Sequence, residues 1–487
     1  MAQKNINFKL ILKFLGILIM ITSGFMLLSM AWSVYFNETD TIKTLLISSA
    51  ITFGSGFALF LVTRQHDHRF IAKKEGYLIV TLTWVSITFF GTIPFSISGY
   101  IPNYSDAFFE TMSGFTTTGA TILNDIEALP KGLLFWRAIT HWLGGMGIIV
   151  MTLAVLPILG VGGMQLYVAE APGTTPNRLH PRIAETAKRL WGIYVLFTLI
   201  QTALLMAGGM NLFHSLSHAF STMATGGFST QNDSIAGYSA YIQYVIIGFM
   251  ILAGMNFSLH YFALKGQLNK VFENDELKFY LTVIAGFAIV LTVAIFLLHD
   301  TALEKAFRDS LFQTVSIITT TGFITSNYLQ WDGFLWFFIF ILMFTGACIG
   351  STSGGIKMIR LLVLVKNTRQ EFKRLIHPMA VIPVRVNNRT IDPEIIHNFL
   401  AFFFLYITFF FVGAAIMTFF GLDFSTAIGA SIATIGNIGP AIGTVGPADT
   451  YANIPDLGKW ILSFYMLLGR LELFTVLLIF SPSFWKS

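Results

Sequence analysis

One short stretch of small residues, Thr116-Thr117-Thr118-Gly119-Ala120-Thr121, indicates the fold of this chain because three similar stretches follow it. These are Ala224-Thr225-Gly226-Gly227-Phe228, Thr320-Thr321-Gly322-Phe323 and Thr434-Ile435-Gly436-Asn437. We align Gly119, Gly226, Gly322 and Gly436 as the central glycines, which stand about 100 residues apart. A segment of about 10–12 residues precedes each glycine and a long apolar run follows it, so one unit occurs four times.

The composition places most of the chain in a lipid bilayer. Of the 487 residues, 54% are hydrophobic and only 11% are charged, whereas soluble domains carry about 25% charged residues. The net charge of +5 does not indicate nucleic acid binding, because the basic residues are scattered over short loops. The single cysteine, Cys348, excludes an internal disulfide and a cysteine-based zinc site.

Ten segments are apolar and long enough to be membrane spans, which need about 20 residues. They are 11–36, 44–62, 77–99, 133–159, 190–209, 241–263, 278–298, 333–363, 396–420 and 458–480. The first two stand outside the repeat, and the other eight flank the four glycine stretches in pairs. We therefore divide the chain into an N-terminal pair of helices, 1–70, and four repeats, 71–165, 166–270, 271–390 and 391–487.

Basic residues mark alternate loops, which fixes an orientation. Lysines and arginines gather in the segments 64–74, 178–189, 265–270 and 366–389. Because cytoplasmic loops carry an excess of Lys and Arg, these loops and both termini are predicted to be cytoplasmic. The four glycine stretches then all lie on the outer side, in loops that carry acidic residues.

The segments before the glycines are too short to cross the bilayer. At 1.5 Å per residue, a helix of about 10–12 residues reaches only about half of the hydrocarbon core. Each segment must therefore enter and return, and irregular backbone at that depth is tolerated only against protein or water. The sequence predicts an all-α polytopic membrane protein in which four helix–pore loop–helix repeats surround one water-filled axis.

The residue types in these loops suit a filter for a monovalent cation. A filter replaces the ion's hydration shell with backbone carbonyls, glycine accepts the unusual conformations required, and threonine adds neutral hydroxyl oxygens. The stretches contain no carboxylate, which argues against a charged ring for divalent ions. Small residues that only pack helices together are the alternative for any single stretch. The candidate ion ligands are Thr117, Thr118, Gly119, Ala224, Thr225, Gly226, Thr320, Thr321, Gly322, Thr434, Ile435, Gly436 and Asn437.

With these residues in hand, the chain resembles the Trk/Ktr/HKT superfamily of potassium transporters, in particular its bacterial Trk-type membrane subunits. The signatures are Ser113 to Thr121, the run Arg137-Ala-Ile-Thr-His141-Trp-Leu-Gly-Gly-Met-Gly147, Gly350 to Lys357, and Gly469-Arg470-Leu471-Glu472. The resemblance covers nearly the whole chain, and the two extra N-terminal spans favour the Trk type. It implies K⁺ as the transported ion, with Rb⁺ as a surrogate, because serine at the first filter glycine marks the Na⁺-preferring plant branch.

The resemblance also implies a gate. The span 333–363 is interrupted by many glycines and hydroxyl residues, which do not continue a helix cheaply. In the family this break is an intramembrane loop beneath the filter, although a simple helix break for packing is the alternative. The candidate gate residues are Gly346, Gly350, Ser351, Gly354, Gly355, Lys357 and Arg470.

Four polar residues can be interpreted in more than one way. A charge within a span, such as Arg470, is a functional hypothesis by default, but a structural ion pair with Glu472 or Glu110 is the alternative. Lys357 either tunes the gate or marks the cytoplasmic boundary. His214 and His218 lie four residues apart, but no further metal ligand is nearby in sequence, so we predict no transition metal site.

The sequence thus predicts K⁺ uptake across a bacterial inner membrane, with an ion-coupled Na⁺ or H⁺ symporter as the alternative. No motif for enzymatic work or nucleotide binding is present, so an enzyme is not expected and no organic cofactor is predicted. The fourfold repeat also argues against the inverted twofold design of many secondary transporters. The resemblance implies a homodimer and a cytosolic partner, a ring of regulator-of-conductance (RCK) domains that binds nucleotides. The segments 366–389 and 178–189 are plausible docking surfaces.

Overall fold

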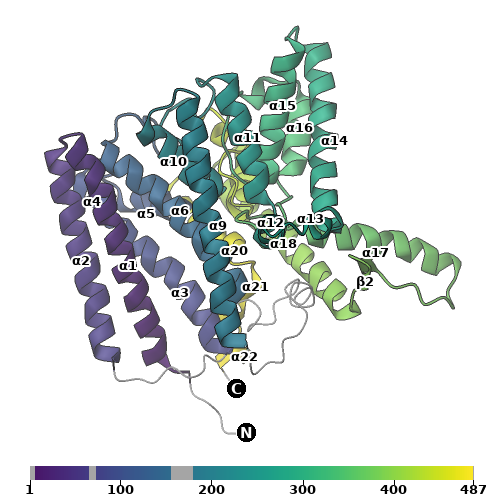
Figure 1. Ribbon diagram of the computed structural model, residues 1–487, viewed down its shortest axis with the longest axis horizontal. Coiled ribbons are helices and arrows are strands. Elements are labelled where there is room, and N and C mark those ends of the chain that lie inside the picture. The colour runs from purple at the N-terminus through teal and green to yellow at the C-terminus, as the bar shows by residue number, and fades with distance from the viewer. Residues whose placement is uncertain (1–5, 65–72, 155–178, 486–487) are drawn as a thin grey trace.

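Helices form nearly all of the regular structure in the computed structural model, which describes residues 6–64, 73–154 and 179–485. The first two helices, α1 (Phe8–Tyr35) and α2 (Thr39–Thr63), form a hairpin at one side of the bundle (Figure 1). They cross where Gly16 and Gly56 meet: a Cβ on Gly16 would lie 2.8 Å from the carbonyl oxygen of Gly56. Glycine at both positions lets the two backbones approach closely, as in other membrane helix pairs.

Four short helices confirm the predicted short segments. They are α5 (Tyr104–Phe115), α10 (Leu212–Met223), α15 (Leu303–Ile318) and α19 (Phe424–Ile435). The helices before them are α3 (Lys73–Gly91) with α4 (Ile93–Ser98), α9 (Leu179–Ala207), α14 (Asp275–Leu298) and α18 (Pro393–Phe419). Those after them are α6 (Lys131–Ala154), α11 (Ala240–Gly254) with α12 (Phe257–Leu264), α16 (Gly333–Leu342) with α17 (Met358–Ile376), and α20 (Asp456–Arg470) with α21 (Phe474–Leu477).

Side-chain caps define where three of the short helices begin. Asn103, Asn211 and Asp423 each accept a hydrogen bond from a backbone N–H in the first turn of α5, α10 and α19. Such caps satisfy amide groups that have no partner inside the helix. The fourth short helix, α15, follows Ala302 and has no side-chain cap of this kind. The helices before these three end separately, next to glycines with positive φ: Gly99, Gly209 and Gly421.

The predicted spans correspond to helices, but three of them are not continuous. Among the described residues, six helices are long and apolar enough to cross a membrane, and two bent pairs raise the number to eight. The predicted span 241–263 is α11 and α12 at 101° to each other, and 458–480 is a pair bent by 111°. The span 333–363 divides into α16, an irregular segment and α17. Residues 155–159 of the predicted span 133–159 lie outside the described residues.

The outer faces of the long helices carry apolar side chains that protein does not cover. On α14, Ile289, Val293 and Leu297 are 59%, 52% and 72% exposed. Such a face would be costly in water, so it identifies the helix surface that lipid covers. The interior instead contains many buried hydroxyl residues, and one group of them lies near the ends of the short helices.

Short elements complete the chain. They are α13 (Leu268–Phe272), η2 (Tyr328–Gln330), β1 (Arg385–Val386), β2 (Arg389–Thr390), η3 (Gly443–Val445), η4 (Leu478–Phe480) and α22 (Pro482–Trp485). The strands β1 and β2 form an antiparallel hairpin beside α17, which extends away from the bundle (Figure 1). Apolar residues of α17, the hairpin and the start of α18 form a small core of their own, separate from the main one.

Candidate ion filter and intramembrane loop

The four short helices lead into loops of one conformation. Two residues after each helix, the backbone adopts a positive φ at a residue other than glycine: Thr117 (51°), Thr225 (53°), Thr320 (54°) and Asn437 (54°). The following residue donates its N–H to a carbonyl five positions earlier, as Thr118 does to Ser113 at 2.8 Å. Left-handed backbone costs about 1–2 kcal/mol in such residues. Four repetitions of it therefore indicate a conformation that the surrounding structure enforces.

The next residue in every loop is a glycine with positive φ. These glycines are Gly119 (79°), Gly227 (81°), Gly322 (78°) and Gly439 (94°). The sequence alignment of the central glycines was therefore correct in repeats 1 and 3 but displaced in repeats 2 and 4. Gly226 is the counterpart of Thr118, and Gly436 is the counterpart of Thr116, at the end of its helix.

Because of this displacement, other candidate ligands in repeats 2 and 4 do not lie at the loop positions predicted for them. Thr434 and Ile435 belong to the last turn of α19, and the hydroxyl of Thr434 donates to the carbonyl of Ala430 at 2.7 Å. Ala224 likewise corresponds to Thr116 and directly follows α10. The loop residues of repeat 4 are instead Asn437, Ile438 and Gly439. The sequence pattern does not distinguish the two registers of repeat 4, because Thr434-Ile435-Gly436 and Asn437-Ile438-Gly439 both place Thr or Asn two residues before a glycine.

The four glycines form a closed ring with carbonyls of the neighbouring repeats. A Cβ on Gly119 would lie 2.2 Å from the oxygen of Gly226, and one on Gly227 would lie 2.0 Å from that of Thr321. A Cβ on Gly322 would lie 2.1 Å from the oxygen of Ile438, and one on Gly439 would lie 2.6 Å from that of Thr118. Each repeat thus approaches the next, and the fourth returns to the first. No side chain fits at any of the four positions without moving a carbonyl.

This ring opens toward a cavity of about 390 Å³. All four ring glycines line the cavity, together with Asp233 and Asp449 from the outer loops. Main-chain oxygens from four sides of one axis can replace the water around a dehydrated cation. Carboxylates at the mouth of such a cavity raise the local concentration of cations.

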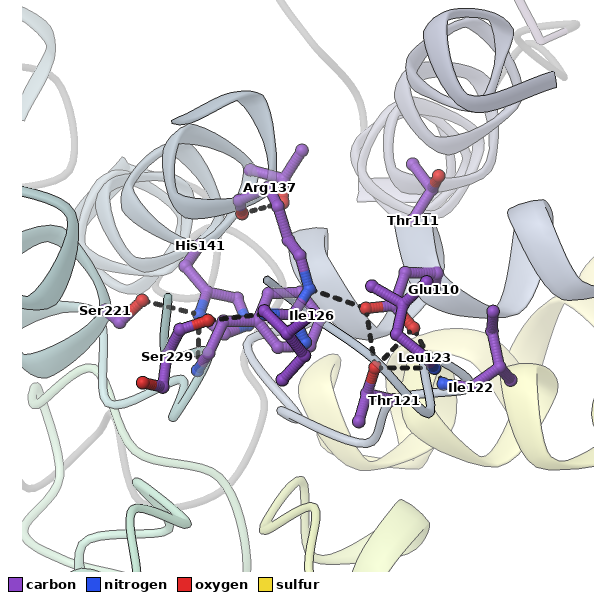
Figure 2. A network of polar contacts seen from close by, with 12 residues as sticks. Glu110, Thr111, Thr121, Ile122, Leu123, Ile126, Arg137, His141, Ser221 and Ser229 are labelled. Carbon is purple, nitrogen blue, oxygen red and sulfur yellow. Dashed lines mark hydrogen bonds and ion pairs between the residues drawn. The ribbon is translucent and has the colours of Figure 1, made fainter. Parts of the chain in front are cut away.

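A buried ion pair supports the first loop from behind (Figure 2). Arg137 on α6 lies 2.6 Å from the carboxylate of Glu110 on α5, and both side chains are at most 2% exposed. Glu110 also accepts hydrogen bonds from the Thr121 hydroxyl and the Ile122 N–H. Arg137 in turn donates to the carbonyl of Ser229 in the second loop. One charge pair therefore fixes the relative position of two adjacent repeats.

The histidines pack behind the second loop. The ring of His141 stacks on Phe228 at 4.0 Å, and a Cβ on Gly226 would lie only 2.4 Å from His141 Nδ1. His218 hydrogen-bonds with the His214 carbonyl and the Ser229 hydroxyl. In the part of the chain that the structure describes, no cluster of three or more His, Cys, Asp or Glu residues could hold a metal ion.

The irregular segment between α16 and α17 lies directly beneath the ring. The Thr352 hydroxyl donates to the carbonyl of Met223, the last residue of α10, at 3.0 Å. The Gly354 N–H donates to the Thr320 hydroxyl at 2.8 Å. A Cβ on Gly354 would meet the Gly436 carbonyl at 2.6 Å. We call residues 343–357 the intramembrane loop, and it contacts the inner ends of repeats 2, 3 and 4.

The predicted gate residues Gly346, Gly350, Ser351, Gly354 and Gly355 all belong to this loop. Two of them, Gly350 and Gly355, have positive φ. Gly346 lies so close to Gly354 that a Cβ would be 2.1 Å from its carbonyl oxygen. The many glycines are therefore required by a tight fold of the loop on itself, which a helix could not supply.

Arg470 connects the loop to the first repeat, and no carboxylate among the described residues forms an ion pair with it. Its guanidinium donates to the carbonyls of Thr352 at 2.6 Å and Gly144 at 2.8 Å, and the side chain is 2% exposed. The alternative of an ion pair with Glu472 or Glu110 is wrong, because Glu472 pairs with Arg360 and Glu110 with Arg137. Lys357 is also buried, and its ammonium group donates to the Ser353 carbonyl and hydroxyl.

The fold is that of a polytopic α-helical membrane protein, and the site is a ring of backbone carbonyls. Together they place the chain in the class of ion-conducting transport proteins. Comparison with known proteins gives the same result. The family model for TrkH, described as a cation transport protein, matches residues 42–487. The chain belongs to the TrkH family, which is a family of transporters and not of enzymes.

Relatives cover the chain from end to end. The Trk system potassium uptake protein TrkH of Halomonas elongata is 39% identical over 99% of this chain and 100% of its own length. The protein of the same name from Salmonella typhimurium is 40% identical with the same coverage. The crystal structure of the potassium transporter TrkH from Vibrio parahaemolyticus superposes with a TM-score of 0.90 at 35% identity, covering 99% of this chain and 100% of the other.

Proposed function

We propose that this chain takes up K⁺ through the ring of carbonyls. The closed contact of four equivalent glycines with four neighbouring carbonyls carries the proposal. It supplies neutral oxygens from four sides and contains no carboxylate, which suits a dehydrated monovalent cation. The relatives named as potassium uptake proteins support K⁺ as the ion. In each loop the proposed ligands are three consecutive residues: the residue with positive φ, the residue after it and the ring glycine. In repeat 1 these are Thr117, Thr118 and Gly119.

The intramembrane loop is proposed as the gate. It lies across the inner end of the filter, where Thr352 and Gly354 hydrogen-bond with residues of the filter repeats. Conduction requires this loop to move, and Arg470 opposes the movement through its two hydrogen bonds. Lys357, which bonds to Ser353 within the loop, helps to hold the closed conformation.

The setting of the protein is also part of the proposal. We place it in a bacterial inner membrane with the basic loops and both termini in the cytoplasm, as a homodimer that binds a nucleotide-regulated RCK partner. The five-part division of the chain is retained, although its boundaries near residues 70 and 165 lie outside the described residues. The proposed docking segment 366–389 comprises α17 from Lys366 onward and the β1–β2 hairpin, and residue 178 of the other segment is not described.

Uptake of radioactive Rb⁺ into proteoliposomes tests this function. Gly119→Ser places a side chain where the Gly226 carbonyl lies and on a backbone with φ of 79°. We expect it to reduce Rb⁺ uptake and the preference for K⁺ over Na⁺. Gly24→Ser is the matched control, because nothing lies within 4 Å of its added Cβ. Equal transport of Na⁺ and Rb⁺ by the unmodified protein, with no effect of Gly119→Ser, would refute the proposal.

The same assay separates a channel from a symporter. Channel-like uptake continues when no Na⁺ or H⁺ gradient is imposed and follows the K⁺ gradient and the membrane potential alone. Uptake that saturates and disappears without the second ion would establish coupled symport instead.

A further inference from the structure

Glu276 contacts the middle of the intramembrane loop and the first turn of the helix that follows it. It lies in the first turn of α14, and its side chain is 4% exposed. One carboxylate oxygen accepts a hydrogen bond from the Ile349 N–H at 2.7 Å and another from the Ile359 N–H at 3.1 Å. Ile349 belongs to the first half of the loop and Ile359 to the first turn of α17, just beyond the loop.

The two amides that Glu276 binds need an acceptor from outside. Ile359 is at the start of α17, where backbone N–H groups have no partner within the helix. The cap residue of α17 is Lys357, whose side chain accepts no hydrogen bond. A carboxylate at that position also interacts favourably with the positive end of the helix dipole. Glu276 therefore serves as the cap of a helix that belongs to a different part of the chain.

Burial of the Glu276 carboxylate costs free energy unless its contacts compensate for the lost hydration. A buried carboxylate is retained only where hydrogen bonds or ion pairs compensate for its lost hydration. The bonds of Glu276 to Ile349 and Ile359 draw together two points that are ten residues apart in sequence. The contacts of the loop with the filter repeats, at Thr352 and Gly354, lie between these two points, so the junction limits how far that part of the loop can move.

The neighbouring residue extends the connection to the cytoplasmic side. Asp275 pairs with Lys366 of α17 at 2.7 Å and accepts a hydrogen bond from the Asn387 N–H in the turn of the β1–β2 hairpin. The Asp275 N–H donates in turn to the Asn387 side chain at 2.7 Å. The first turn of α14 thus joins the cytoplasmic hairpin, through Asp275, to the loop, through Glu276.

From these contacts we infer that Glu276 is a positioning residue that clamps the intramembrane loop in its closed conformation. The inference rests on the proposed function of the loop as a gate. The Asp275 contacts allow the β1–β2 hairpin to act on the clamp, because displacement of the hairpin would move Asp275, the residue next to Glu276. Release of the clamp frees the Ile349 side of the loop first, since Ile359 is also held within α17.

The single cysteine offers a direct readout of the clamp. Cys348 precedes Ile349 and is 1% exposed, and it is the only cysteine of the chain. A maleimide added to the purified full-length protein reports how often this side of the loop opens. The charge of Glu276 also affects the Cys348 thiol, and comparison of Glu276→Ala with Glu276→Gln removes that effect because both variants lack the charge. The experiment compares Glu276→Ala, Glu276→Gln and Glu273→Ala, with Rb⁺ uptake measured on the same preparations. Glu273 is an exposed glutamate three positions earlier and serves as the matched control.

We expect Cys348 in Glu276→Ala to react about tenfold faster, since two buried N–H groups lose a charged acceptor. Glu276→Gln keeps an oxygen but loses the charge, so its rate should lie between those of alanine and the unmodified protein. Glu273→Ala should react at the unmodified rate. Rb⁺ uptake should rise in the same order as the labelling rates.

The possible results separate the clamp from the gate. A folded Glu276→Ala protein that reacts at the unmodified rate would overturn the inference. If that variant does not fold, Glu276→Gln decides, and its labelling at the unmodified rate is the negative result. Faster labelling with unchanged Rb⁺ uptake would support the clamp but refute the proposal that this loop gates transport.

Discussion

Substitution of the two glycines near the end of repeat 4 tests which one belongs to the filter ring. Gly439 has φ of 94°, and a Cβ there would lie 2.6 Å from the Thr118 oxygen and 2.8 Å from the Gly119 carbonyl carbon. Gly436 has an ordinary φ of −81°, and its added Cβ would be nearest to Ile432, in its own helix, at 2.8 Å. The alignment of repeats by sequence pointed to Gly436, whereas the backbone conformation points to Gly439.

The expected magnitude for Gly439→Ala follows from two contributions. The left-handed backbone costs alanine about 1–2 kcal/mol, and forcing a methyl group into a closely packed site costs about 1–3 kcal/mol. Together these amount to about 2–5 kcal/mol, and the lower value corresponds to about 30-fold. Because Thr118 must move to relieve the contact, the penalty falls on a carbonyl of the ring itself.

The measurement is the initial rate of Rb⁺ uptake per reconstituted protein, with and without competing Na⁺. We expect Gly439→Ala to lose at least about 30-fold in Rb⁺ uptake, and Gly436→Ala to lose less than about threefold, since the last turn of α19 can adjust. Both variants must elute as folded protein. Loss of uptake in Gly436→Ala with tolerance of Gly439→Ala would show that the assignment of the ring is wrong.

Three further substitutions probe the supports of the filter and loop. Arg470→Ala removes the hydrogen bonds to Thr352 and Gly144 and should raise Rb⁺ uptake, and unchanged uptake at normal expression would contradict the gating role. Glu110→Gln leaves the buried Arg137 without its partner, at a cost of about 3–5 kcal/mol. It should lower the thermal unfolding temperature far more than Glu304→Gln, which breaks a partly exposed pair, and equal effects would count against the ion pair as a support. The Asp423 cap has its pKa lowered from 3.8 to about 2, chiefly by the Ser425 hydroxyl. Its contribution to stability is therefore complete above about pH 4 and is lost as the pH falls toward 2, so the difference in unfolding temperature from Asp423→Asn should shrink over that range, and a constant difference would contradict the assignment.

The repeat was visible in the sequence because its signals are local. Short segments that begin with a polar cap and end in Thr and Gly cannot cross a bilayer, whatever surrounds them. The register of the loops in repeats 2 and 4 is not determined by local signals. Gly226 and Gly227 are adjacent and both small, so the sequence pattern does not indicate which one has positive φ, and Ile438 hides the likeness of repeat 4 to the others.

The breaks in the helices after the filter were only partly predictable. The glycines of the intramembrane loop indicated one break. The bend between α20 and α21 contains none: Glu472 and Leu473 adopt positive φ there, and Glu472 is held by Arg360, 112 residues away. A contact between residues so distant in sequence leaves no periodic signal in either segment.

The sequence alone determined that this protein lies in a membrane, that one unit is repeated four times, and that the pore loops are rich in Gly and Thr. These properties follow from hydropathy, segment length and the conformational freedom of glycine, each of which acts over a few residues. The tertiary structure decided which glycine closes the ring, which carboxylate pairs with which arginine, and that Glu276 binds both the intramembrane loop and the first turn of α17. Those outcomes depend on close contacts between different repeats, because a buried polar group takes the partner that the packing of the whole chain places within reach.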